Sequence, residues 1–237
     1  LEEVKTRLEI TRNVRLADID LGSLDKAGLV VISEASGKDV RLGSLREVEE
    51  IHFLSNTGMT DLSMPSLEFA GTLLIDANRR LKTLELPALG RAGTVRVRGN
   101  MDLRALHLSS LREVNQWFVV SGNRGLTSLE APGLVAVGNA VDLIENARLA
   151  TVDLGGLNRV GFNATAEGIE EVRLATGAPR AFSGNFLRVE ENKAFGTCEA
   201  NALRDQLRGF TGTVKIADNK ADGCYRPDVS SDEEDDE

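Results

Sequence analysis

Aromatic residues are scarce in this chain, where Phe, Trp and Tyr together make up 4% of 237 residues. A compact globular enzyme of this length usually buries more rings, so the sequence argues against a core built around aromatic side chains. Glycine is plentiful at 23 residues, and the hydrophobic content is 41%. This balance favours a thin, elongated core of aliphatic side chains that is crossed by many tight turns.

The chain also lacks any block of lysine and arginine with interleaved aromatics, and its formal net charge is −9. Nucleic-acid binding needs a basic surface that neutralises phosphates, so we expect no nucleic-acid partner. No apolar run approaches the roughly 18 residues of a membrane-spanning helix. The chain opens on Leu1-Glu2-Glu3-Val4 without an apolar signal segment. We therefore expect no membrane span here, and either a cytosolic location or a targeting segment that has been removed.

Most of the acidity lies at the C-terminal end. Seven of the last ten residues, 228–237, are Asp or Glu and none is basic, so removing them leaves a charge of −2 for residues 1–227. Like charges repel one another, and such a segment cannot form a core. We predict a disordered acidic tail at 228–237 and a nearly neutral folded body.

One pattern recurs at intervals of 21 to 27 residues: apolar, variable, apolar, variable, small or polar, then a marker residue. It is clearest at 73–78, 95–100, 118–123 and 141–146. Alternation of this kind predicts a strand with one buried face. Two of the ten markers are Ala35 and Gly168. The other eight are Asn13, Asn56, Asn78, Asn100, Asn123, Asn146, Asn192 and Asn219.

A repeat of this length predicts a solenoid, in which each coil buries its apolar face against the next. The fold class that we predict is all-β, a single right-handed β-solenoid of about ten coils of about 22 residues each. A second apolar ladder, clearest as Leu81, Leu84, Leu86 and Leu89, fills the other walls of the coil. The eighth coil is expected to be irregular or widened, because Asn163 and Thr165 occupy inward positions there and Gly168 replaces the marker asparagine.

The recurring asparagine has a structural explanation. At an inward bend, backbone N–H and C=O groups lose their partners in the sheet, and an asparagine side chain can replace them while tolerating unusual backbone angles. We therefore predict that these asparagines stack into a buried ladder and do not bind a ligand.

The two ends of the solenoid differ. Thr197 is predicted to cap a helix over 198–208 that ends at Gly209, within a C-terminal cap at about 196–227 that completes a domain spanning 1–227. Only residues 1–7 precede the first strand, so we expect an N-terminal cap to be missing from this sequence or supplied by another domain.

Cys198 and Cys224 are the only cysteines, and both fall in the C-terminal cap. We favour a disulfide between them, which implies an oxidising compartment, over two free thiols. Two cysteines without a nearby histidine cannot supply four zinc ligands, so we predict no metal site.

Residues 81–89, LKTLELPAL, followed by 93–100, GTVRVRGN, resemble the receptor L-domain repeat. This leucine-rich repeat is found in growth-factor receptor ectodomains and, in long arrays, in fungal cell-wall and bacterial envelope proteins. The resemblance covers about residues 8–224. It implies a right-handed β-helix that is exported or surface-exposed and that binds or adheres without catalysis, and it agrees with the disulfide.

Two departures from the family's pattern narrow the group of proteins that the chain resembles. The Cys-rich modules of animal receptors are absent, and the many glycosylation sequons of the fungal proteins are reduced to one, at Asn163. The predicted inward direction of Asn163 makes it a poor acceptor. With 21 Arg against 7 Lys, the composition favours a bacterial envelope protein.

The outward positions of the long strands are the candidate binding surface. In the middle coils they mix apolar side chains with arginine and a tryptophan, which is typical of the centre of an interface. The alternative is that these residues merely favour strands. The candidate binding residues are Leu54, Leu74, Asp76, Arg96, Arg98, Trp117, Val119 and Ile144.

An enzyme is the rival interpretation. Some β-helices are polysaccharide lyases or hydrolases, and Asp76, Asp142, Arg96 and Arg98 would be the catalytic candidates here. The alternative is that Asp76 and Arg98, as diagonal neighbours, form a solvated ion pair. His52 and His107 fall at different coil positions with no serine or cysteine placed for a triad, and the coil lengths leave no room for a cleft-forming loop.

We therefore predict a non-catalytic recognition or adhesion module, without a cofactor, that binds a protein or glycan. A carbohydrate-active enzyme and a purely structural envelope component remain the alternatives.

Overall fold

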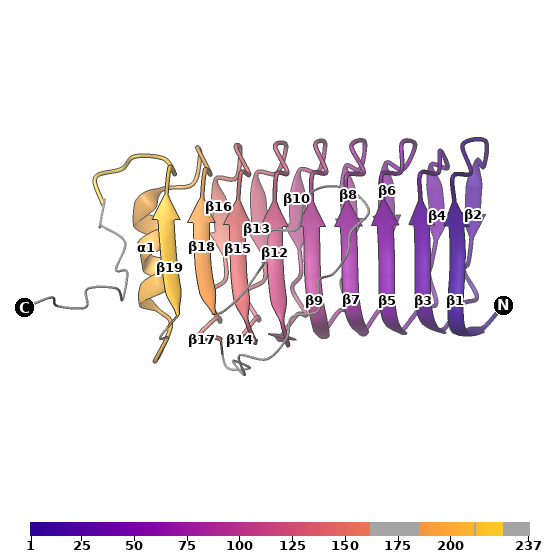
Figure 1. Cartoon of the computed structure of the whole chain (residues 1–237), viewed down its shortest axis with the longest axis horizontal. Helices are drawn as coiled ribbons and strands as arrows, with labels where there is room; N and C mark the ends of the chain where they lie inside the picture. The colour runs from indigo at the N-terminus through magenta and orange to yellow at the C-terminus, as the bar shows by residue number, and fades with distance from the viewer. Residues whose placement is uncertain (162–184, 211, 225–237) are drawn as a thin grey trace, which may run out of the picture.

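The structure, a computed structural model, describes residues 1–161, 185–210 and 212–224. Figure 1 shows a parallel β-solenoid in which long strands form the front sheet and short strands form a second sheet behind it. The chain rises along each long strand, crosses to the rear sheet and returns below, so the coil is right-handed as predicted.

The long sheet is parallel throughout, with strand order β1-β3-β5-β7-β9-β12-β15-β18-β19. Its strands are β1 (Glu3–Thr11), β3 (Lys26–Ser33), β5 (Glu47–Leu54), β7 (Phe69–Asp76), β9 (Arg91–Arg98), β12 (Trp117–Ser121), β15 (Ala140–Ile144), β18 (Phe186–Glu190) and β19 (Thr213–Ala217). Two-residue strands extend the sheet along its lower edge: β11 (Glu113–Val114), β14 (Ala136–Val137) and β17 (Arg159–Val160).

The short sheet has seven three-residue strands. They are β2 (Asp18–Asp20), β4 (Asp39–Arg41), β6 (Asp61–Ser63), β8 (Thr83–Glu85), β10 (Ala105–His107), β13 (Ser128–Glu130) and β16 (Thr151–Asp153). The core lies between the two sheets and is mostly aliphatic. The predicted second ladder is part of it, since Leu81, Leu84, Leu86 and Leu89 are at most 3% exposed.

The asparagine ladder is confirmed. The six inner members, from Asn56 to Asn192, are at most 2% exposed, whereas Asn13 is exposed and Asn219 half-buried. Asn100 shows the shared pattern: its side-chain amide donates to the carbonyl oxygen of Ile75 at 2.7 Å, and its side-chain oxygen accepts from the backbone N–H of Asn78 at 3.0 Å. Each amide thus satisfies backbone groups at the bend of the preceding coil.

The unusual backbone angle at the bend belongs to the residue before each marker, which is an asparagine in eight cases and Ala35 in one. Nine such residues have φ between 51° and 65°: Arg12, Glu34, Ser55, Ala77, Gly99, Gly122, Glu145, Glu191 and Asp218. The expectation that the asparagine itself adopts this angle is therefore wrong. The asparagine supplies hydrogen bonds, and its predecessor supplies the left-handed turn.

The long strands have a second bend near their start. There the backbones of adjacent coils approach closely. A Cβ atom on Gly93 would lie 2.2 Å from the carbonyl oxygen of Gly71, so only glycine fits. In the next coil, one extra residue at this bend interrupts the strand, which divides into β11 and β12.

The ladder passes directly from Asn146 to Asn192, and β15 pairs directly with β18. No rung separates them, so the described chain has nine rungs, close to the expected ten. The residues predicted for the eighth coil, Asn163, Thr165 and Gly168, lie outside the described residues. The acidic tail at 228–237 does too.

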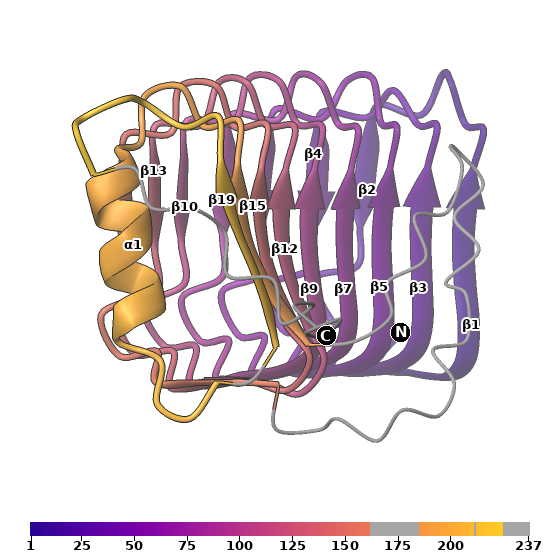
Figure 2. The same ribbon diagram turned by 60° about the vertical axis from the view of Figure 1, so that its left-hand side comes forward.

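Helix α1 (Thr197–Asp205) covers the C-terminal end of the solenoid (Figure 2). The predicted capping role of Thr197 is wrong, because Gly196 occupies the N-cap position without a side-chain bond. Instead, the Asp222 carboxylate accepts from the backbone N–H of Cys198 at 3.0 and 3.1 Å. A carboxylate at this position satisfies a free helix N–H group.

The predicted disulfide between Cys198 and Cys224 is confirmed, with 5.0 Å between the Cα atoms. It joins the first turn of α1 to the segment after β19. Leu203, on the inner side of α1, is 6% exposed and belongs to the core. None of the helices in the described part of the chain is long and apolar enough to cross a membrane.

Candidate functional site

The outer face of the long sheet, meaning the side chains of its strands that point away from the core, carries all eight candidate binding residues. The structure buries five of them: Leu74 at 1% exposure, Ile144 at 7%, and Asp76, Trp117 and Val119 at 8% each. Leu54 and Arg96 are half-buried, and Arg98 is exposed. The expectation of an open apolar patch is therefore wrong for most of this face.

The aromatic residues of the outer face meet across one strand. Trp117, Ala140 and Phe186 stand side by side on β12, β15 and β18. Because alanine is small, the two rings approach to 5.9 Å between centroids and leave Ala140 1% exposed. With Val119, these residues form an apolar cluster separate from the main core, here called the outer cluster.

An ion pair adjoins the outer cluster. Arg188 donates two hydrogen bonds to the carboxylate of Asp142, at 2.6 and 2.5 Å, and its guanidinium lies 4.4 Å from the centroid of the Phe186 ring. The hydrogen bonds to Asp142 raise the pKa of Arg188. Two parallel bonds fix the guanidinium plane, which then stacks on the ring.

Neither Arg188 nor Phe186 was among the predicted site residues. Asp142 and Arg188 are directly opposite in the sheet, although 46 positions separate them in the chain. The repeat had placed another coil between them. Asp142 and Arg188 each stand four residues before a marker asparagine, so the sequence shows that they occupy equivalent positions. The coil that was predicted between them prevented their pairing from being predicted.

The second ion pair of the outer face joins Asp76 to Arg96, with 3.0 Å between Oδ2 and Nη2. Asp76 lies directly opposite Arg98 in the sheet, so the expected diagonal arrangement with Arg98 is wrong, and Arg96 is the diagonal partner. Burial raises the pKa of Asp76, and the charges of Arg96 and Arg98 oppose this effect. Within the described residues, Asp76 Oδ1 is buried without a hydrogen-bond partner.

The catalytic candidates are not arranged as a glycosidase pair. Asp76 on β7 and Asp142 on β15 are three strand spacings apart, about 14 Å at roughly 4.8 Å per strand. The two carboxyl groups of glycoside hydrolases are separated by about 5 to 9.5 Å. Each aspartate is also paired with an arginine. His52 and His107 stand on different sheets.

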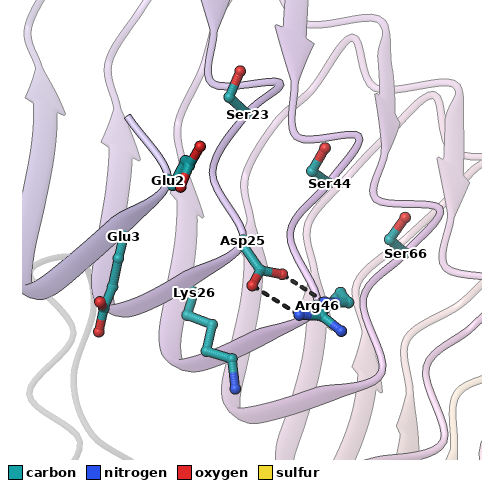
Figure 3. A pocket seen from close by; sticks show the side chains of 8 residues that line it. All are labelled: Glu2, Glu3, Ser23, Asp25, Lys26, Ser44, Arg46 and Ser66. Atoms are coloured by element: carbon teal, nitrogen blue, oxygen red, sulfur yellow. Dashed lines mark hydrogen bonds and ion pairs between the residues drawn. The ribbon is translucent and has the colours of Figure 1, made fainter.

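A polar groove of about 820 Å³ follows the lower corner of the first coils (Figure 3). It is lined by Glu2, Glu3, Ser23, Asp25, Lys26, Ser44, Arg46 and Ser66. Arg46 donates two hydrogen bonds to Asp25, at 2.6 and 2.8 Å, and Lys26 donates one to Glu47 at 2.7 Å. Since these cations are paired, the groove offers stacked serine hydroxyls with little free positive charge.

Cys198, Asp222 and Cys224 place possible ligand atoms within 4.8 Å of one another. The two sulfurs are joined in a disulfide and carry no thiolate, which is the form that binds zinc. This cluster therefore stabilises the cap and is not a metal centre.

The fold and the outer face together define a parallel β-solenoid with a disulfide-linked C-terminal cap and an apolar cluster outside its core. The chain matches no protein-family model and no curated protein. The resemblance to the receptor L-domain repeat thus rests on the repeat residues alone.

Proposed function

We propose that this chain is an exported, non-catalytic recognition or adhesion module that binds a protein or a glycan through the outer face of the long sheet. The observation that supports this most directly is the outer cluster. Trp117, Val119, Ala140 and Phe186 gather on the side of the sheet that faces away from the core. The Arg188 guanidinium lies 4.4 Å from the centroid of the Phe186 ring, so aromatic and cationic side chains meet on this face.

The composition of this face is that of a contact surface. Trp and Arg are enriched among the residues that dominate binding energy at interfaces. On the middle strands β5, β9 and β12 of the described structure, the last residues of the outer face are Leu54, Arg98 and Ser121, which are half-buried or exposed and are here called the margin. These three side chains are the ones that we propose reach a partner, whereas the buried residues hold the surface in shape.

The disulfide supports the exported location, because disulfides persist in oxidising compartments and are rare in the cytosol. The resemblance to the receptor L-domain repeat points in the same direction, and the arginine-rich composition favours a bacterial envelope. The enzyme alternative is weaker, since the aspartates of the outer face are far apart and paired with arginine.

The test is binding of the purified chain to arrays of purified glycans and extracellular proteins. The variant Leu54→Arg with Ser121→Arg places two bulky cations on the open margin. The matched control, Ala105→Arg with Ser128→Arg, adds the same charge on the short sheet. We expect at least one probe to be retained by the wild type and the control and lost by the margin variant.

Equal retention of that probe by both variants would exclude the outer face, and no retention by the wild type would leave a structural scaffold as the better interpretation. Release of reducing ends from polysaccharides by the wild type, abolished by Asp76→Asn, would establish the enzyme instead.

A further inference from the structure

Four turns of identical construction follow β7, β9, β12 and β15 along the upper edge of the solenoid (Figure 1). In each, the carbonyl oxygen of the marker asparagine accepts from the backbone N–H three residues later. The distances are 2.9 Å from Leu81 to Asn78, 3.2 Å from Leu103 to Asn100, 3.0 Å from Leu126 to Asn123 and 2.9 Å from Leu149 to Asn146. The two central residues of each turn therefore stand at its tip.

Arginines gather at these tips and beside them. Their six positions, here called the arginine ridge, are Arg79, Arg80, Arg98, Arg104, Arg124 and Arg148, and all six side chains belong to exposed residues. Three carboxylates accompany them: Asp102 at the tip of the second turn, Glu145 beside the fourth, and Asp76, which lies directly opposite Arg98 and pairs with Arg96. The six arginines of the ridge thus exceed these carboxylates by three charges, on a body whose total charge is −2.

Within the described part of the chain, no arginine of the ridge forms an ion pair. Among the described residues, the one hydrogen bond of these side chains runs from Arg104 to the carbonyl oxygen of Gly125, at 3.4 Å. This contrasts with Arg46, Arg96 and Arg188, which each pair with an aspartate. Unpaired like charges side by side repel one another, so their clustering favours a ligand that neutralises them.

The spacing of the ridge is fixed by the asparagine ladder below it. The amides of Asn78, Asn100 and Asn123 bond to one another at 3.3 Å along the stack, which holds successive tips in register. Adjacent rungs are about 4.8 Å apart, so the ridge extends over roughly 14 Å in a straight line. A linear ligand with a regularly repeated negative charge matches this geometry.

We propose that the arginine ridge binds a linear anionic polysaccharide, whose carboxylate or sulfate groups meet guanidinium groups on successive rungs. Guanidinium forks bind such groups through paired hydrogen bonds. Single-stranded nucleic acid is the less suitable polyanion, because its binding sites add aromatic side chains on which bases stack, and the ridge has none. The ridge is a second surface, which shares Arg98 with the margin of the outer face, and it depends on the proposed function only for the exported location.

The experiment measures binding of heparin and of polygalacturonate to the purified chain at several salt concentrations. The ridge variant replaces Arg79, Arg80, Arg124 and Arg148 with Gln. The control variant replaces Lys5, Arg91, Arg112 and Arg208 with Gln, which removes the same charge from exposed positions elsewhere. We expect the ridge variant to bind at least one polysaccharide roughly tenfold more weakly and with a shallower salt dependence, and the control to stay within about twofold of the wild type.

Equally weakened polysaccharide binding in both variants would overturn the proposal that the ridge is the binding site, because net charge alone would then explain binding. Absence of polysaccharide binding by the wild type would overturn the proposal too. Tighter binding of a single-stranded oligothymidylate than of either polysaccharide would overturn the ligand class. Matched thermal unfolding of the three proteins verifies that the fold is intact. The margin variant, Leu54→Arg with Ser121→Arg, should still bind the polysaccharide, so failure of the ridge and failure of the outer face are distinguishable.

Discussion

The backbone N–H of Asn146 donates a hydrogen bond to the side-chain oxygen of Asn192, 3.1 Å away and 46 positions further along the chain. The corresponding steps from Asn100 to Asn123 and from Asn123 to Asn146 are 23 positions each. The ladder is thus continuous in space between Asn146 and Asn192, although the sequence between them is twice as long as one coil. The long step contains residues 162–184, which are 23 in number and lie outside the described residues.

Deletion of residues 162–184 is predicted to preserve the solenoid. The side-chain amide of Asn185 donates to the carbonyl oxygen of Gly161 at 3.0 Å, so the two ends of this segment meet. Joining them leaves a 23-residue step and recreates the Gly-Asn pair found at Gly138 and Asn139 in the preceding coil. We expect cooperative unfolding, an intact disulfide and a change of about 1 kcal/mol or less from loop closure, measured by thermal and urea denaturation.

Deletion of residues 101–123, also 23 in number, is the control. It removes β10, β11 and β12, a true rung, and should reduce both the β-sheet circular dichroism and the urea dependence of unfolding. If the deletion of 162–184 fails to fold or loses the disulfide, the continuity of the ladder across this step is wrong.

Asn100→Ala should be strongly destabilising. Asn100 is 0% exposed, and its removal leaves the Ile75 carbonyl and the Asn78 N–H buried without their partner. Each unsatisfied group costs about 1 to 3 kcal/mol, so the free energy of unfolding should fall by roughly 2 to 5 kcal/mol in urea denaturation. Asn13→Ala is the matched control, because Asn13 is exposed and its amide bonds only to Thr11 in its own coil. Similar losses in the two variants would contradict the ladder's energetic role.

The ladder and the inward rows were predictable because each depends on local periodicity, and the disulfide was predictable because the only two cysteines both fall in the C-terminal cap. The alternating pattern of a strand predicts on which face of the sheet Leu74 or Val119 lies. It does not predict whether the side chain is buried on that face. Leu74 points outward between His52 and Arg96 on the two neighbouring strands, and these long side chains flank it. Which residues are neighbours across the sheet also depends on every intervening coil, so Asp142 and Arg188 could not be paired from the repeat alone.

The residue before each marker asparagine has a left-handed backbone conformation. Two substitutions at such positions should therefore change the free energy of unfolding in opposite directions. Ala77 has φ 57°, an angle that costs about 1 to 2 kcal/mol for a residue with a Cβ atom. Ala77→Gly should therefore raise the free energy of unfolding by about 0.5 to 1 kcal/mol after the entropy of glycine in the unfolded chain is subtracted. Gly99→Ala should lower it by about 1 kcal/mol, although a Cβ at Gly99 meets no atom closer than 3.7 Å. Thermal denaturation checks both, and destabilisation by Ala77→Gly would refute the assignment of strain.

Asp76→Asn is predicted to stabilise the protein at neutral pH. Burial raises the pKa of Asp76 above its ordinary value of 3.8, and burial also lowers the pKa of Arg96, so both charges of this pair are disfavoured where they stand. The folded state then binds the aspartate proton more tightly than the unfolded state does. The wild type therefore loses stability as the pH rises from 3.8 through the raised pKa. Asparagine resembles the protonated form and escapes this loss.

The measurement is urea denaturation of wild type and variant between pH 4 and pH 8. The advantage of Asp76→Asn should be largest at the upper end and should vanish toward the lower end. Asp25→Asn is the control with the opposite sign, because the hydrogen bonds from Arg46 hold the pKa of Asp25 below 3.8. Its carboxylate contributes stability at neutral pH that is lost on acidification, so this variant should be slightly less stable at pH 7. A destabilising Asp76→Asn across the whole range would show that the ion pair with Arg96 outweighs the burial of its charges.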